Sequence, residues 1–159
     1  MSIASGALLF ADSNVLIEDL LLPASAASIV VDLVAQGVYR MATSELVIKD
    51  VENVILKKAS HDPDSLDILI AEFHNMRKLA NLVVVPDPTP DQVRVIYGEY
   101  ISVMRHKADI PVLAAGLQAK PDVILSGNRE HFNDAVSARC RIPIFSCSEF
   151  LQVLATDPG

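Results

Sequence analysis

Short segments with the character of buried strands alternate along the chain with longer segments in which apolar residues recur at helical spacing. Polar or proline-containing breaks separate the two kinds of segment, as in the change from the apolar Leu8–Ala11 to the polar Asp12–Asn14. An apolar run that is too short for a helix and is bounded by such breaks predicts a strand. The segments that we predict as strands cover residues 8–11, 39–43, 82–85, 123–125 and 142–145.

Amphipathic segments between the strands predict helices, because their apolar residues fall on one face. Ser44 and Ser148 stand directly before two of these segments as N-cap residues, and Gly37 follows another as its C-terminal stop. The predicted helices cover residues 15–22, 24–36, 45–58, 65–79, 90–104, 109–119 and 149–154, with a short helical turn ending at Phe132. Strands that alternate with helices predict a parallel sheet covered on both faces.

The length of 159 residues and the absence of an internal repeat predict one domain over residues 1–159. The 51% of hydrophobic residues predicts a large core and some apolar surface; the first two helices are the candidate surface for a homodimer or a partner protein. No long apolar run and no basic N-terminal segment is present, so we expect no membrane association and no secretory signal. Cys140 and Cys147 match no zinc or redox motif, which predicts reduced thiols in a cytoplasmic protein, with a disulfide as the alternative.

The formal net charge of −7 argues against a protein that binds nucleic acid through a broad basic surface. An anionic substrate would therefore need metal ions or a local group of basic residues. Arg105, Lys107 and Arg129, together with His106 and His131, are the candidate contacts to phosphates, and solvated loops are the alternative interpretation. The sequence contains no phosphate-cradling glycine loop, dinucleotide fingerprint or Ser–His–Asp arrangement.

Two acidic residues stand where a predicted element begins. Asp12 follows the first strand and precedes a helix, at the sheet edge where ligands bind in open α/β folds. Asp109 precedes the helix that carries Pro111 in its first turn. Each of these side chains is either a helix cap or a metal ligand.

A third acid comes from the amphipathic helix 45–58. On a helical wheel, Asp50 lies roughly 80° from the centre of the apolar stripe, Glu52 about 120° and Glu45 about 140°. Asp50 is therefore the acid of this helix that points closest to the core, with a solvated flank as the alternative. Carboxylates that converge at one sheet edge repel one another unless a divalent cation offsets their charge, and oxygen ligands favour Mg²⁺ or Mn²⁺.

Five segments of the chain resemble, in order, the motifs of the PIN-domain family, whose members include VapC-like toxin ribonucleases. The first resembles that family's opening acid, Ser/Thr and Asn, and the later segments resemble its second, third, fourth and closing motifs. These segments are residues 10–17, 44–51, 109–115, 123–132 and 144–151. Together they extend over nearly the whole chain.

The resemblance implies a three-layer α/β/α fold with a five-stranded parallel sheet of order 3-2-1-4-5. It also implies a Mg²⁺- or Mn²⁺-dependent endoribonuclease that acts on single-stranded RNA, commonly as a toxin paired with an antitoxin protein. Carried over residue by residue, the metal-binding and catalytic acids are Asp12, Asp50 and Asp109. The further matching positions are Asn128 as a metal ligand and Ser13, Asn14 and Ser126 as polar neighbours.

Two positions depart from the family pattern. Asp50 is one methylene shorter than the usual Glu, and Asn128 stands where many members have a fourth Asp. These departures motivate an alternative, a catalytically weak or inactive PIN domain that binds RNA or a partner protein. A second alternative is a haloacid-dehalogenase-like phosphatase with Asp12 as nucleophile; such enzymes usually carry an Asp at the position of Asn14.

Overall fold

The sheet has five parallel strands in the order β3-β2-β1-β4-β5, as the resemblance implied. The computed structural model describes residues 2–156, so residues 1 and 157–159 of the predicted domain lie outside it. Phe10 in the central strand pairs with Ala42 of β2 on one side and with Ile124 of β4 on the other. The strands are β1 (Leu8–Ala11), β2 (Arg40–Ser44), β3 (Val83–Val85), β4 (Val123–Leu125) and β5 (Ile144–Phe145).

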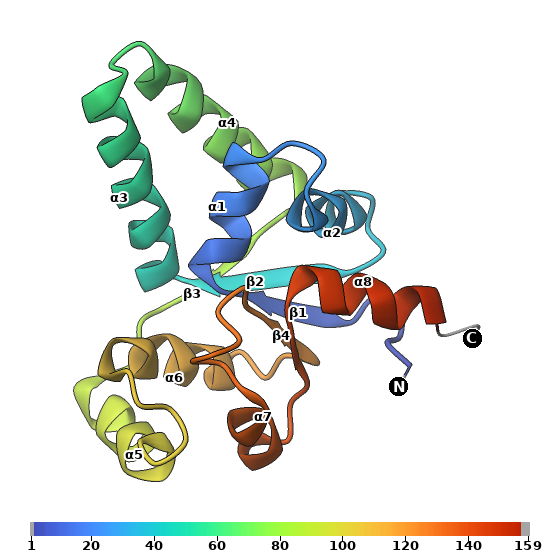
Figure 1. The fold of residues 1–159 in the computed structure, drawn as a ribbon, viewed down its shortest axis with the longest axis vertical. Coiled ribbons are helices and arrows are strands. Elements are labelled where there is room, and N and C mark those ends of the chain that lie inside the picture. The colour runs from blue at the N-terminus through green and yellow to red at the C-terminus, as the bar shows by residue number, and fades with distance from the viewer. Residues whose placement is uncertain (1, 157–159) are drawn as a thin grey trace.

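Helices cover both faces of the sheet and complete the three-layer α/β/α architecture (Figure 1). One face carries α1 (Ser13–Leu21), α2 (Ala26–Ala35), α3 (Glu45–His61), α4 (Ser65–Leu79) and α8 (Cys147–Thr156). The other carries α5 (Pro90–Tyr100), the 3₁₀ helix η1 (Lys107–Asp109), α6 (Ile110–Gln118) and α7 (Asp134–Cys140). In Figure 1, α3 and α4 pack against each other and reach away from the sheet as an arm.

Side-chain caps fix where several helices begin. The Ser44 hydroxyl accepts a hydrogen bond from the backbone N–H of Val47, which confirms Ser44 as the cap of α3. The closing helix begins earlier than predicted, and its cap is not Ser148. Instead, Ser146 and Glu149 exchange reciprocal hydrogen bonds, because a Ser with Glu three residues later forms a capping box.

One helix end and one helix differ most from the prediction. Helix α5 ends at Tyr100 rather than at residue 104, although the apolar Val103 and Met104 continue the pattern. These residues follow in a turn in which both of their N–H groups donate to the Tyr100 carbonyl. Helix α7 was not predicted, because Val136 is its single buried residue and leaves no apolar periodicity to detect.

The core centres on β1 and β4, whose side chains are buried on both sides of the sheet. Phe10 is 1% exposed, and Gly116 of α6 packs against its ring. A Cβ at position 116 would lie 3.2 Å from that ring, so the small residue lets α6 approach the sheet closely. This packing fixes α6 against the central strand, and Asp109 directly precedes the first residue of that helix.

Helices α1 and α2 use most of their apolar side chains inside the core. On their outer side Leu22 and Ile29 are exposed, whereas the arm exposes Leu56, Ile68 and Ile70. The homodimer expected from the composition of the first two helices stays a prediction. Within residues 2–156, no single helix has the length and apolar character to cross a membrane. Helices α1 and α2 have this length and apolar character only when they are taken together, and they are bent by 97° relative to each other.

Cys140 and Cys147 are free thiols, as expected, and no disulfide joins them. Burial raises the pKa of Cys147 to about 12, and the nearby charges of Glu18 and Asp19 act in the same direction. Burial also raises the pKa of Cys140. Both thiols are therefore packing residues that stay protonated at neutral pH.

Candidate active site

Asp12 is the buried acid at the carboxyl end of β1. It is 7% exposed, and its backbone N–H donates to the carbonyl of Leu125 at 3.0 Å. Its Oδ1 accepts a hydrogen bond from the Ser13 N–H at 2.8 Å, and its Oδ2 accepts from the Ser126 hydroxyl at 2.8 Å and the Asn14 amide at 3.2 Å. Asp12 is therefore both the N-cap residue of α1 and an anchor between the ends of β1 and β4.

The predicted polar neighbours Asn14 and Ser126 complete this anchor. Asn14 Oδ1 accepts a hydrogen bond from the Gly127 N–H at 2.6 Å, and Ser126 Oγ accepts one from the Asn128 N–H at 3.1 Å. Ser126 itself is fully buried. The strand ends thus hold Asp12 in one orientation before any ligand binds.

Asp109 influences the other two predicted acids electrostatically. Burial raises the pKa of Asp12 most; hydrogen bonds from Ser126, Ser13 and Asn14 oppose this, and the charge of Asp109 raises it further. The pKa of Asp50, in α3, is also raised, first by burial and then by the charge of Asp109. Asp109 therefore acts on both of the other acids, which places all three in one region of negative charge.

Asp109 does not cap the helix that it precedes. It occupies the N-cap position of α6, but its side chain forms no capping hydrogen bond there, so the cap interpretation was wrong. Its Oδ2 instead lies 2.6 Å from Nδ1 of His131, and the two side chains are 25% and 20% exposed. The carboxylate is therefore engaged by a residue from the turn after β4.

The sequence did not predict His131 as the partner of Asp109. Its Nδ1 lies 2.8 Å from the Asn128 amide nitrogen, and its ring stacks on that of His106 with centroids 3.6 Å apart. The sequence signal for it is slight: a histidine three residues after Asn128, in the turn that follows β4. Because no helical or strand period applies in a turn, its direction could not be deduced.

The acidic side chains of the site are of the type that binds a hard divalent cation. Among residues 2–156, no group of three or more acidic, histidine or cysteine side chains stands close enough to hold a metal ion. The donors offered by Asp12, Asp50 and Asp109 are carboxylate oxygens, however, and no ion pair of the described residues neutralises Asp12 or Asp50. Carboxylate oxygens are the ligands that Mg²⁺ and Mn²⁺ prefer, and Asp109 would have to give up its contact with His131 to join them.

Comparison with solved structures shows that the fold is a known one. PAE2754 from Pyrobaculum aerophilum matches with a TM-score of 0.64 and 17% identity, over 98% of this chain and 100% of that chain. VapBC2 from Rickettsia felis, bound to a DNA fragment from its promoter, matches with a TM-score of 0.60 and 10% identity, over 87% and 98%. FitAcB from Neisseria gonorrhoeae matches with a TM-score of 0.55 and 17% identity, over 88% and 98%.

These similar structures are PIN-domain proteins of the toxin type. The chain has the PIN-domain fold. No protein-family model matches the sequence, and no curated protein matches it either. At identities of 10% to 17%, the likeness establishes the PIN fold, and function has to be argued from the residues.

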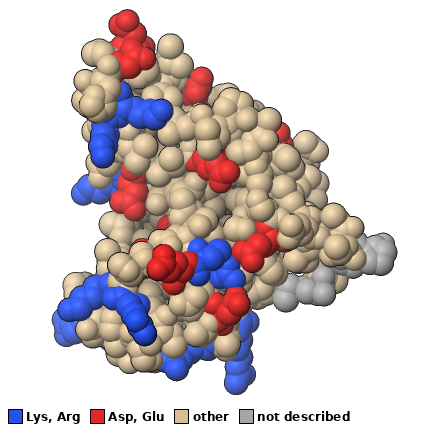
Figure 2. Space-filling model, in the orientation of Figure 1, with Lys and Arg blue, Asp and Glu red and all other residues tan. Residues whose placement is uncertain are grey.

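The three basic residues predicted near the site have different surroundings in the PIN fold. Arg105 and Lys107 are exposed in the segment between α5 and α6, and Lys107 Nζ lies 5.8 Å from the centre of the Tyr97 ring. Arg129 binds Glu149 and Asp134 and also donates to the backbone, so its guanidinium is already occupied. Figure 2 shows basic side chains over α5 and the segment after it, with acidic ones beside them.

Proposed function

We propose that this protein is a Mg²⁺- or Mn²⁺-dependent endoribonuclease that acts on single-stranded RNA. The observation that carries the proposal is the Asp12 carboxylate, which is buried, hydrogen-bonded in place and subject to the negative charge of Asp109 without a basic partner. A buried carboxylate in such surroundings is costly unless a cation neutralises it. A site that requires a cation for neutralisation, and that holds its acids in place before the cation binds, is suited to a metal-dependent reaction.

The residues of the chain have separate tasks in this proposal. The bound metal ion would lower the pKa of a water molecule and polarise the scissile phosphate. Asp12, Asp50 and Asp109 would hold it through their oxygens, and Ser126 and Asn14 keep the Asp12 carboxylate oriented.

Contacts to the substrate would come from outside this group of acids. Arg105 and Lys107 are exposed and lie on the Asp109 side of the site, where they can bind phosphates of the RNA. Asn128 can offer an amide oxygen to the metal without adding charge. A local pair of cations in a chain of net charge −7 matches a substrate that is held at a few phosphates rather than along a broad surface.

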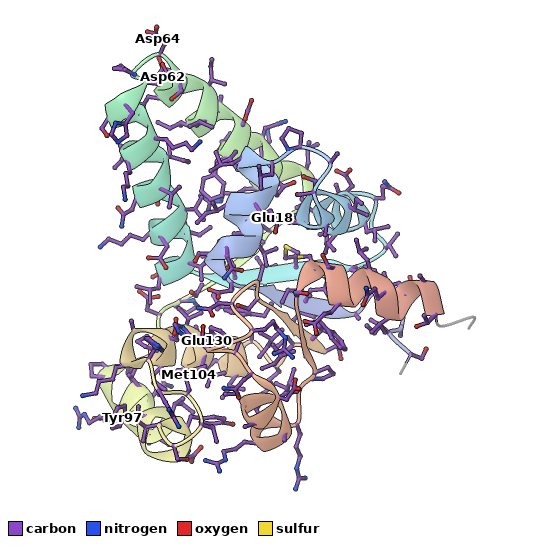
Figure 3. All side chains as sticks on the ribbon, viewed as in Figure 1. Glu18, Asp62, Asp64, Tyr97, Met104 and Glu130 are labelled. Atoms are coloured by element: carbon purple, nitrogen blue, oxygen red, sulfur yellow. The ribbon has the colours of Figure 1, made fainter. Side chains whose placement is uncertain are left out.

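The test is cleavage of a labelled single-stranded RNA by the purified chain with Mn²⁺ or Mg²⁺. Asp12→Asn should reduce cleavage by more than about 100-fold, because it removes a carboxylate that would bind the metal itself rather than a residue that only orients such a ligand. Asp64→Asn is the matched control, since Asp64 is exposed and forms no cap bond at the far tip of the α3–α4 arm (Figure 3). Equal rates for the wild-type protein and Asp12→Asn would exclude this mechanism.

A toxin role with an antitoxin partner belongs to the same proposal. VapBC2 and FitAB, whose structures resemble this one, are toxin–antitoxin complexes bound to DNA. The exposed Leu56, Ile68 and Ile70 of the α3–α4 arm give a partner protein or a second copy an apolar surface to bind. Expression in the bacterial cytoplasm should arrest growth, Asp12→Asn should not, and light scattering of the purified chain tests the homodimer.

One arrangement favours a second candidate, a PIN fold that binds RNA or a protein without catalysis. Asp109 is engaged by His131, and Asn128 supplies no charge. Calorimetry with Mn²⁺ distinguishes the two candidates. Saturable binding below millimolar concentration supports the nuclease, and its absence together with RNA binding supports the non-catalytic protein.

A further inference from the structure

A cavity of about 610 Å³ adjoins the candidate site on the side of α5 and α7. Its walls come from the segment that follows α5, including Arg105 and His106, and from the turn before α7, including Glu130 and His131. Figure 3 labels Glu130 and Met104 in this region. A cavity of this size accommodates one nucleotide.

One wall of the cavity is aromatic. The rings of His106 and His131 stack with centroids 3.6 Å apart and an angle of 23° between their planes, and His106 is exposed. Unpaired RNA bases are commonly bound by stacking on histidine and other aromatic rings. The histidine pair therefore offers a flat surface to a base that has left the RNA stack.

The charged groups of the cavity match the other parts of a nucleotide. Arg105 is exposed, and no ion pair or hydrogen bond of the described residues engages its guanidinium, so it can bind a phosphate. Glu130 is also exposed, and its carboxylate has no such partner either, whereas Asp134 is bound to Arg129 at 2.6 Å. A carboxylate accepts hydrogen bonds from the exocyclic amino group of a base, which adenine and cytosine have and uracil lacks.

One side chain links the cavity to the proposed catalytic acids, because His131 forms part of its wall and lies 2.6 Å from the Asp109 carboxylate. We infer that it is a base-binding subsite that takes an amino-bearing base of single-stranded RNA beside the phosphate to be cleaved. Histidine stacking, Glu130 and Arg105 would contact the base ring, its amino group and a flanking phosphate. The inference rests on the proposed function, since it names the substrate feature that the same site selects.

The test uses the full chain in EDTA, where binding is measured without cleavage. Fluorescence anisotropy with labelled six-nucleotide oligo-A, oligo-C and oligo-U should show the weakest binding for oligo-U. His106→Ala should weaken binding of oligo-A and oligo-C by about tenfold, as expected for the loss of one stacked base. His61→Ala is the control, because His61 is exposed at the end of α3, away from the cavity.

Two more variants separate the roles of the charged residues. Glu130→Ala should abolish the preference over oligo-U, and Arg105→Ala should weaken all three oligonucleotides alike and reduce the salt slope by about one. Arg94→Ala, at an exposed arginine of α5 paired with Asp91, should leave both quantities unchanged. No binding in EDTA, no base preference, or variants that bind like the wild-type protein would each overturn the subsite.

The outcomes also separate the subsite from the nuclease. If the oligonucleotides bind with the expected preference but Mn²⁺ gives no cleavage, the subsite stands and the proposed reaction fails. If Mn²⁺ gives cleavage that depends on Asp12 while His106→Ala and Glu130→Ala bind and cleave all sequences like the wild-type protein, the reaction stands and the subsite fails.

Discussion

Oδ2 of Asp109 and Nδ1 of His131 lie 2.6 Å apart, and this contact joins the start of α6 to the turn after β4. It gives the Asp109 carboxylate a partner while Asp12 and Asp50 have no ion pair among the described residues. A metal ion that recruits Asp109 must therefore exchange this contact for its own.

Replacing His131 should make the metal bind more tightly. In His131→Ala the Asp109 carboxylate has no contact with an imidazole to give up, so calorimetry should show Mn²⁺ affinity about two- to fivefold higher, the contribution expected of one partly exposed polar contact. His74→Ala, at an exposed histidine of α4, should bind Mn²⁺ like the wild-type protein. A loss of affinity in His131→Ala would instead make the imidazole itself a ligand.

The sheet and most helices could be predicted because apolar periods report directly which residues enter the core. The strand order came from the resemblance, and the meeting of Asp12 with Ser126 follows because parallel strands end at the same edge. Helix α7 could not be predicted, because Val136 is its single buried residue. The early end of α5 could not be predicted, because the apolar residues up to Met104 continue the helical pattern although they lie in a turn.

The contacts that the two histidines of the site form could not be predicted from the sequence, for a different reason. His106 and His131 come from a turn and a connecting segment, where no period indicates the direction of a side chain. For Asp109 the sequence left a helix cap as the alternative to a metal ligand, because Asp often precedes a Pro-containing first turn, and only the three-dimensional contact shows that its carboxylate points elsewhere.

The ionised Asp12 should destabilise the metal-free protein at neutral pH. Burial raises its pKa above the ordinary value of 3.8, so the folded state binds this proton more tightly than the unfolded chain does. That contribution favours folding at low pH and is lost as the pH rises through the raised pKa. In EDTA, Asp12→Asn should therefore melt at a higher temperature than the wild-type protein at pH 7, and the difference should shrink toward pH 4.

A metal titration completes this test. Mn²⁺ should raise the melting temperature of the wild-type protein at pH 7, because the ion binds only the folded state and offsets the charge of Asp12. The Asn variant should respond much less. If Asp12→Asn melts at a lower temperature than the wild-type protein at pH 7 in EDTA, the hydrogen bonds to the Asp12 carboxylate stabilise the folded state more than burial of its charge destabilises it.

Two glycines with opposite surroundings give a matched pair of stability predictions. A Cβ at Gly127 would lie 3.2 Å from Asn14 Oδ1, the atom that accepts the hydrogen bond from the Gly127 N–H, whereas a Cβ at Gly98 of α5 meets no atom within 4 Å. Gly127→Ala should thus destabilise the protein by about 1–3 kcal/mol and lower RNA cleavage by displacing Asn14. Gly98→Ala should stabilise the helix by roughly 0.5–1 kcal/mol. Urea denaturation measures both, and equal effects would contradict the packing.

Converting Asn128 to Asp should lower the stability of the metal-free protein and raise its affinity for metal ions. The Asn128 side chain lies beside His131 Nδ1, which in turn contacts Asp109, so a carboxylate there adds a fourth negative charge to the region. In EDTA, Asn128→Asp should melt below the wild-type protein because like charges repel. With Mn²⁺ it should bind at least about tenfold more tightly, because affinity for hard cations rises with the number of charged ligands.

The isosteric Asn128→Asp change needs a control that removes the side chain without adding charge. Asn128→Ala leaves His131 without its amide neighbour, yet it adds no ligand, so it should not gain Mn²⁺ affinity. The decisive quantity is the rise in melting temperature on adding Mn²⁺, which should be largest for Asn128→Asp and smallest for Asp12→Asn. If Asn128→Asp shows the same rise as the wild-type protein, position 128 lies outside the reach of the metal, and the ion would have to be held by Asp12, Asp50 and Asp109 alone.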